Sequence, residues 1–113
     1  MPILQVVFER FASAVRLLAL SGESLQQRLA DAFIQGRLIL LTETDLPDQF
    51  QERFSELKNG LSDHGRKRMD QVIREITEKQ AEHYIQIILD LHSEIAKEVF
   101  RHRGSVRRNE AND

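Results

Sequence analysis

The chain has 113 residues, of which 41% are hydrophobic, 30% are charged and 6% are aromatic. This length fits one globular domain with a single core, and the few aromatic, Gly and Pro residues favour helices over a β-sandwich or barrel. The chain contains no cysteine, which excludes disulfides, thiolate nucleophiles and thiolate metal sites. We therefore expect an all-α protein located in the reducing environment of the cytoplasm.

The first helix is predicted over residues 3–20. Glu9, Arg10 and Arg16 interrupt this apolar segment, so we expect a core helix rather than a signal or membrane segment. Opposite its main apolar face lies a second apolar row, formed by Val6, Leu17 and Leu20. A helix that is apolar on two sides is either central in its bundle or partly covered by another subunit, and we keep both interpretations.

The second helix is predicted to start at Ser24, which with Gln27 three residues later matches a capping box. Its apolar face runs from Leu25 to Leu40, and Gly36 in that face indicates close approach of a neighbouring backbone. A second apolar row on this helix is formed by Ile34, Leu38 and Leu41. Together with the second row of the first helix, it predicts a self-association surface.

The third helix begins near Pro47, which suits a first helical turn, and Asp45 or Thr44 is the predicted cap. Its single apolar stripe consists of Leu46, Phe50, Phe54, Leu57 and Leu61. The pair Asn59-Gly60 predicts a left-handed stop. This helix should lie on the surface with one face inward, and the segment 42–63 is acidic, with six acidic residues against two basic ones.

A short fourth helix is predicted around Met69 to Ile76, and a last helix over residues 78–102. Thr77 and Gln80 form a second capping-box pattern, which separates the two helices. Gly104 is the predicted end of the last helix, so residues 1–103 form one helical domain and residues 104–113 a flexible basic and polar tail.

Catalytic and metal sites are not expected. No Glu stands three residues before a His as in carboxylate-bundle metal sites, and no glycine-rich phosphate loop is present. We therefore predict a protein that is not an enzyme and carries no metal or cofactor. His92 is the most informative histidine, because it lies in the apolar face of the last helix and is predicted in a polar core or interface.

Basic residues gather in two places and offer a candidate anion contact, formed by Arg66, Lys67, Arg68, Arg101, Arg103, Arg107 and Arg108. Nucleic acid is therefore an alternative partner. It is not favoured, because the chain is acidic overall, with a formal net charge of −2, and exposed aromatic residues are not expected.

The segments DLPDQFQERFSELKNGLS and RMDQVIREITEKQAEHYIQIILDL resemble a family of short all-α bacterial proteins to which no function is assigned. The resemblance implies a helical fold and a bacterial, cytosolic setting, and its matching positions are Leu46, Pro47, Phe54, Leu57, Leu61, Met69 and Ala81.

The sequence thus predicts a bundle of four main helices plus one short helix. Its expected role is a non-catalytic interaction or regulatory module that acts as a homo-oligomer, a dimer, and binds a protein partner. A nucleic-acid-associated regulator and a small-ligand-binding bundle with His92 in the pocket are the two alternatives.

Overall fold

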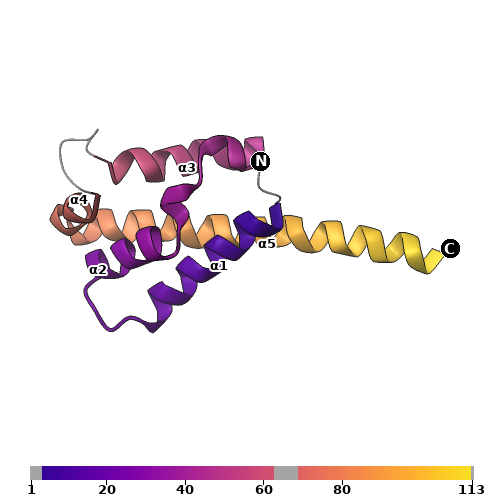
Figure 1. Cartoon of the computed structure of the whole chain (residues 1–113), viewed down its shortest axis with the longest axis horizontal. Coiled ribbons are helices and arrows are strands. Elements are labelled where there is room, and N and C mark those ends of the chain that lie inside the picture. Colours follow the sequence, from indigo (N-terminus) through magenta and orange to yellow (C-terminus); the bar gives the residue numbers. More distant parts are fainter. Residues whose placement is uncertain (1–3, 63–68, 113) are drawn as a thin grey trace.

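The longest element, α5 (Glu78–Asn112), is the helix along which the rest of the chain is arranged. The computed structural model describes residues 4–62 and 69–112, with side chains over residues 4–62 and 71–101. In this part of the chain five α-helices and three short helical turns pack together and no strand is present. The C-terminal end of α5 projects beyond the other helices (Figure 1), which gives the molecule a long axis of 56 Å. The predicted all-α bundle is confirmed.

The first helix, α1 (Leu4–Leu20), matches its prediction closely. Its inward residues recur at helical spacing and are buried: Val7, Phe11, Ala14 and Leu18. This face packs on α5 and on the turn that follows α2. Because burial of a large apolar side chain stabilises a fold by about 1.5–3 kcal/mol, the contact with α5 is a main source of stability for α1.

The second helix, α2 (Leu25–Ala30), starts as predicted. The hydroxyl of Ser24 accepts a hydrogen bond from the backbone N–H of Gln27 at 3.2 Å. A complete capping box would also have the Gln27 side chain accept from the N–H of Ser24. Instead, the Gln27 side chain donates to Asp31, further along the helix, at 2.9 Å. The N-cap therefore fixes where α2 begins.

The continuation of α2 to Leu41 is a prediction that the structure overturns. Residues Asp31–Gln35 form a π-helical turn, η1, in which the N–H of Gly36 donates to the carbonyl of Asp31 at 3.2 Å. Arg37 then adopts a left-handed conformation with φ 65°, and a 3₁₀ turn, η2 (Leu38–Leu40), follows. The extra residue of the π turn and the left-handed step break the 3.6-residue period from which a continuous helix was predicted.

The predicted role of Gly36 is confirmed. A Cβ on Gly36 would lie 3.0 Å from the Cα of Ala14, so the absence of a side chain lets the two backbones meet, and it would lie 2.2 Å from the Ala32 carbonyl oxygen in its own segment. The contact with Ala14 joins the end of η1 to the buried face of α1.

The third helix, α3 (Asp48–Gly60), follows a 3₁₀ turn, η3 (Glu43–Asp45). Pro47 is the residue before its first turn, but neither Asp45 nor Thr44 caps it, because the Asp45 carboxylate accepts from the N–H of Thr42 at 2.8 Å. The helix ends at Gly60, where the stop is predicted, but Gly60 has no positive φ, so the left-handed conformation is not formed. The glycine is explained instead by Tyr84, whose ring occupies the space that a Cβ would need.

The fourth helix, α4 (Met69–Glu75), is separated from α5 at Thr77, as predicted. The Thr77 hydroxyl accepts from the N–H of Gln80 at 3.1 Å, and the Gln80 side chain accepts from the N–H of Thr77 at 2.9 Å. Both halves of this capping box are formed. The carbonyl of Ile76, beyond the end of α4, accepts from the side chain of Gln26 in α2 at 3.1 Å.

The predicted end of the last helix at residue 102 is wrong, since α5 continues through Gly104 to Asn112. A glycine inside a helix costs only about 1 kcal/mol relative to Ala, and it ends a helix only where it takes the left-handed conformation. Whether residues 104–113 are flexible stays a prediction.

The core is apolar throughout the described side chains, where no polar or charged residue is buried. It draws on every described α-helix, with Phe11, Phe33, Phe54, Ile73 and Leu91 among its largest fully buried members. Within the two described ranges, no helix combines the length and apolar character needed to cross a membrane.

Candidate protein–protein interface

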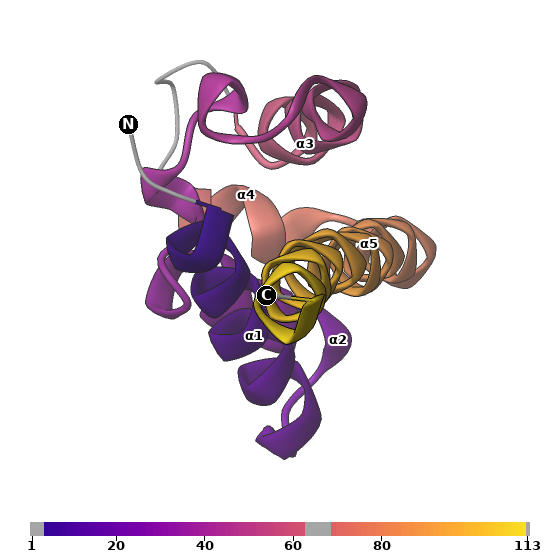
Figure 2. The same ribbon diagram turned by 90° about the vertical axis from the view of Figure 1, so that its right-hand side faces the viewer.

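The position of α5 follows from the helices that pack on it, α1, α2 and α3. Its inward residues recur every three or four positions and are buried: Ala81, Ile88, Leu91, Ile95 and Val99. Figure 2 looks towards the C-terminal end of α5 and shows α3 on one side of it and α1 on another. The remaining side of α5 is where its exposed residues lie.

A strip of side chains on this outer side is apolar or small. It consists of Leu89, Ser93, Ala96 and Phe100, spaced by four, three and four residues, which places them on one helix face; we call it the α5 strip. Phe100 is 56% exposed and Leu89 37% exposed. Large apolar side chains in contact with water, aligned along one helix, are typical of a surface that binds another protein.

Phe100 is held in place by aromatic contacts with α1. Its ring meets the ring of Phe8 edge to face, with centroids 6.1 Å apart and an interplanar angle of 67°. Phe8 also stacks on His92, at 5.5 Å and 17°. These arrangements are favourable for ring pairs. They restrict the orientation of Phe100 before any partner arrives, which lowers the entropy cost of binding.

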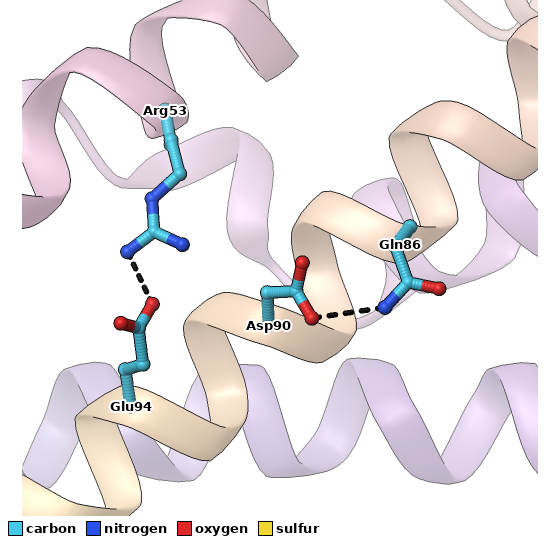
Figure 3. A network of polar contacts seen from close by, with 4 residues as sticks. All are labelled: Arg53, Gln86, Asp90 and Glu94. Atoms are coloured by element: carbon cyan, nitrogen blue, oxygen red, sulfur yellow. Dashed lines mark hydrogen bonds and ion pairs between the residues drawn. The ribbon is translucent and has the colours of Figure 1, made fainter.

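One flank of the α5 strip is charged. Asp90, Lys97 and Arg101 lie on neighbouring positions of this flank and are exposed. Asp90 accepts a hydrogen bond from Gln86 at 2.9 Å, drawn in Figure 3. Arg101 pairs with Glu98 at 3.0 Å, yet 72% of its side chain remains in contact with solvent. The flank therefore carries an acidic group towards its N-terminal end and basic groups towards its C-terminal end.

Polar contacts with α3 lie on this same flank of α5, where it borders α3. Arg53 of α3 forms an ion pair with Glu94 (Figure 3), and Glu56 contacts His83 at 2.5 Å. The side chains of both pairs are at least one-third exposed, so each pair contributes little to stability, about 0–1 kcal/mol. Their effect is positional, because they direct these charges towards α3 and away from the α5 strip.

Two of the predicted self-association residues cannot serve as a surface. Leu38 and Leu41 are fully buried within the chain. The π turn and the left-handed Arg37 rotate this segment away from the continuous helix on which the prediction rested, and they turn both leucines into the core. Of the other predicted members, Val6, Leu17 and Ile34 are half-buried, and Leu20 is 77% exposed.

The predicted anion contact is described only in part. Arg66, Lys67 and Arg68 lie outside the described residues, and so do the side chains of Arg103, Arg107 and Arg108, whose backbone belongs to α5. Arg101 is exposed on α5, as the anion contact requires. Arg101 is the one member of the two basic clusters whose side chain lies in the described part of the chain, so the anion contact stays a prediction.

His92 is half-buried, and the face of its ring is covered by Phe8. The sequence predicts it in a polar core or at an interface. It stacks on Phe8, the residue that also meets Phe100, and lies one turn before Ala96, which places it at the edge of the α5 strip. Among the described residues, no three His, Asp or Glu side chains are grouped so that they could hold a metal ion.

Sequence reasoning missed Leu89 and Phe100 as surface residues. The sequence feature that indicates exposed apolar residues on this helix is the width of its apolar arc. Ile85, Leu89 and Ala96 lie well to one side of Ile88. One helix of a small domain cannot bury so broad an arc.

Comparison of the chain with protein-family models, with curated proteins and with solved structures finds no match.

Proposed function

We propose that this chain is a non-catalytic interaction module of the cytoplasm, which forms a homodimer and presents its remaining helical surfaces to a protein partner. The proposal rests on the α5 strip, where Leu89 and Phe100 are exposed next to the aromatic contacts of Phe8 and His92. Among the described side chains the core is entirely apolar, which suits a scaffold that recognises its partners through surface residues.

The alignment of the α5 strip residues on one helix face favours self-association over a chance exposure of apolar residues. Four positions on one face, with an aromatic residue already oriented by its neighbours, resemble the rigid anchor residues of protein interfaces. Single exposed leucines elsewhere, such as Leu40 at 63% exposure, lack this alignment.

The test is the molar mass in solution by light scattering, measured from about 1 µM to 1 mM because one helix face is a small interface and small interfaces are typical of weak, reversible association. The wild-type chain should pass from monomer to dimer within this range. Phe100→Asp should stay monomeric, since dimerisation would bury an unpaired carboxylate. Leu40→Asp, a matched change of an exposed residue outside the strip, should dimerise like the wild type. A wild-type chain that remains monomeric throughout would refute the dimer.

A third variant tests whether the dimer forms through the α5 strip or through the second apolar row of α1, which the sequence predicts as part of a self-association surface. Leu20 is the most exposed member of that surface. If Leu20→Asp abolishes dimerisation and Phe100→Asp does not, the dimer uses α1 and the α5 strip is not its interface.

Nucleic-acid binding is the competing outcome. Titration of the wild-type chain with a labelled DNA duplex and a labelled RNA hairpin at several salt concentrations tests it directly. Binding that weakens steeply with salt and is lost in Arg101→Ala would favour the regulator over the interaction module.

A further inference from the structure

We infer that the second copy binds the α5 strip with its own α5 running antiparallel, about a two-fold axis that passes between Ser93 and Ala96. This inference rests on the proposed homodimer and specifies its geometry. Two observations carry it: the order of side-chain sizes along the strip and the order of charges along its flank.

Side-chain size along the strip is symmetric. A large residue stands at each end, Leu89 and Phe100, and two small residues, Ser93 and Ala96, stand between them. The midpoint of the outer pair coincides with the midpoint of the inner pair. In an antiparallel two-fold contact, Leu89 of one copy therefore meets Phe100 of the other, and Ser93 meets Ala96. The small central pair allows the two helices to approach closely, while the large outer pairs fill both ends of the seam.

The charged flank selects the same direction. In antiparallel helices the same flank of each copy meets its counterpart, so Asp90 of one copy lies between Lys97 and Arg101 of the other. The two-fold axis produces this arrangement twice. In a parallel pair the charged flank of one copy would meet the other flank of its partner, so Asp90 would gain no contact with Lys97 or Arg101 of that copy. All three residues are exposed, so they are available for such pairs.

The inference is tested by reversing charges in the full-length chain. Asp90→Arg alone and Arg101→Asp alone should each raise the Kd of self-association by about tenfold or more, because the two-fold axis doubles the effect of each substitution. An equimolar mixture of the two variants should form a heterodimer with a Kd near the wild-type value, since each copy now offers the charge that the other lacks. Sedimentation velocity with one variant fluorescently labelled measures this directly.

Matched controls use the same changes elsewhere on the surface. Glu52→Arg on α3 and Arg74→Asp on α4 alter exposed charges outside the strip, and neither should change the Kd by more than about twofold. Circular dichroism confirms that each variant is folded. If Arg101→Asp loses helix content, Lys97→Asp takes its place, because Lys97 flanks the same position of the partner helix.

A cysteine cross-link gives an independent readout, because the chain has no cysteine of its own. In the antiparallel pair the two copies of residue 86 lie about 25 Å apart along the axis at 1.5 Å per residue, so Gln86→Cys should not form a disulfide dimer. In a parallel pair it should cross-link readily.

The outcomes distinguish the two proposals. A wild-type chain without self-association refutes the homodimer. A dimer in which the mixed variants show no rescue, or in which Gln86→Cys cross-links with itself, leaves the homodimer standing and overturns the antiparallel geometry. Rescue in the mixture without cross-linking supports both.

Discussion

Gly36 packs closely against Ala14: a Cβ on Gly36 would come within 3.0 Å of the Ala14 Cα and 3.1 Å of its Cβ, and it would also lie only 2.2 Å from the carbonyl oxygen of Ala32 in the preceding turn. The contact with Ala14 sets the distance between α1 and the turn that follows α2. Gly36→Ala should therefore lower the free energy of unfolding by about 1–3 kcal/mol, as for other overpacked core sites. Urea unfolding followed by circular dichroism measures the loss.

Gly22→Ala is the matched control for this prediction. A Cβ at Gly22 would meet no atom within 4 Å, so its substitution should leave the free energy of unfolding within about 0.5 kcal/mol of the wild type. Equal losses at Gly22 and Gly36 would show that neither Ala14 nor the Ala32 carbonyl oxygen makes Gly36 necessary.

Arg37 should respond to substitution according to backbone conformation. Its φ of 65° is unfavourable for L-residues and most unfavourable for β-branched ones. Arg37→Val should destabilise the fold by about 1–2 kcal/mol, whereas Arg37→Gly should not destabilise it. Thermal unfolding of the two variants and of the wild type measures their relative stability, and Arg37→Val should be the least stable. If valine is tolerated as well as glycine, the left-handed step does not exist in solution.

Thr77 should matter for stability although it is exposed. Its hydroxyl accepts from the N–H of Gln80 and thereby caps α5. Thr77→Ala should cost about 1 kcal/mol of unfolding free energy. Gln71→Ala, at an exposed site of α4, serves as the reference and should change stability by less than about 0.5 kcal/mol. An unaffected Thr77→Ala would mean that other contacts alone hold the junction between α4 and α5.

The ion pair between Arg53 and Glu94 should contribute little. Its side chains are 36% and 43% exposed, so solvent screens part of the attraction, although the Glu94 oxygen that meets Arg53 is itself buried. A double-mutant cycle with Arg53→Gln and Glu94→Gln should give a coupling free energy below about 1 kcal/mol, and the coupling should fall as salt is added. A coupling that is large and independent of salt would contradict this and show that the pair is shielded from solvent.

Features encoded by neighbouring residues could be predicted from the sequence. Ser24 and Thr77 each mark a helix start, because a hydroxyl that accepts a nearby N–H is a local device. The buried face of α1 and the single stripe of α3 also follow from helical spacing alone.

The features that could not be predicted depend on contacts between distant segments. Gly60 looked like a helix stop, but its requirement comes from the ring of Tyr84 in another helix. The π turn before Gly36 and the left-handed Arg37 leave no clear mark in composition or periodicity. Their effect is large, since they bury Leu38 and Leu41 and transfer the candidate interface from α2 to α5.

The contact of Phe8 with His92 and Phe100 joins the two ends of the sequence and bears on how the chain folds during synthesis. The inner face of α1 emerges from the ribosome well before α5, the helix that covers it, is translated. Until then, Phe11 and its neighbours on α1 lack their main covering surface. Contacts of long sequence separation slow folding, and apolar surface exposed during that interval invites aggregation. Nascent chains of this protein should therefore depend on chaperones more than the small size of the domain suggests.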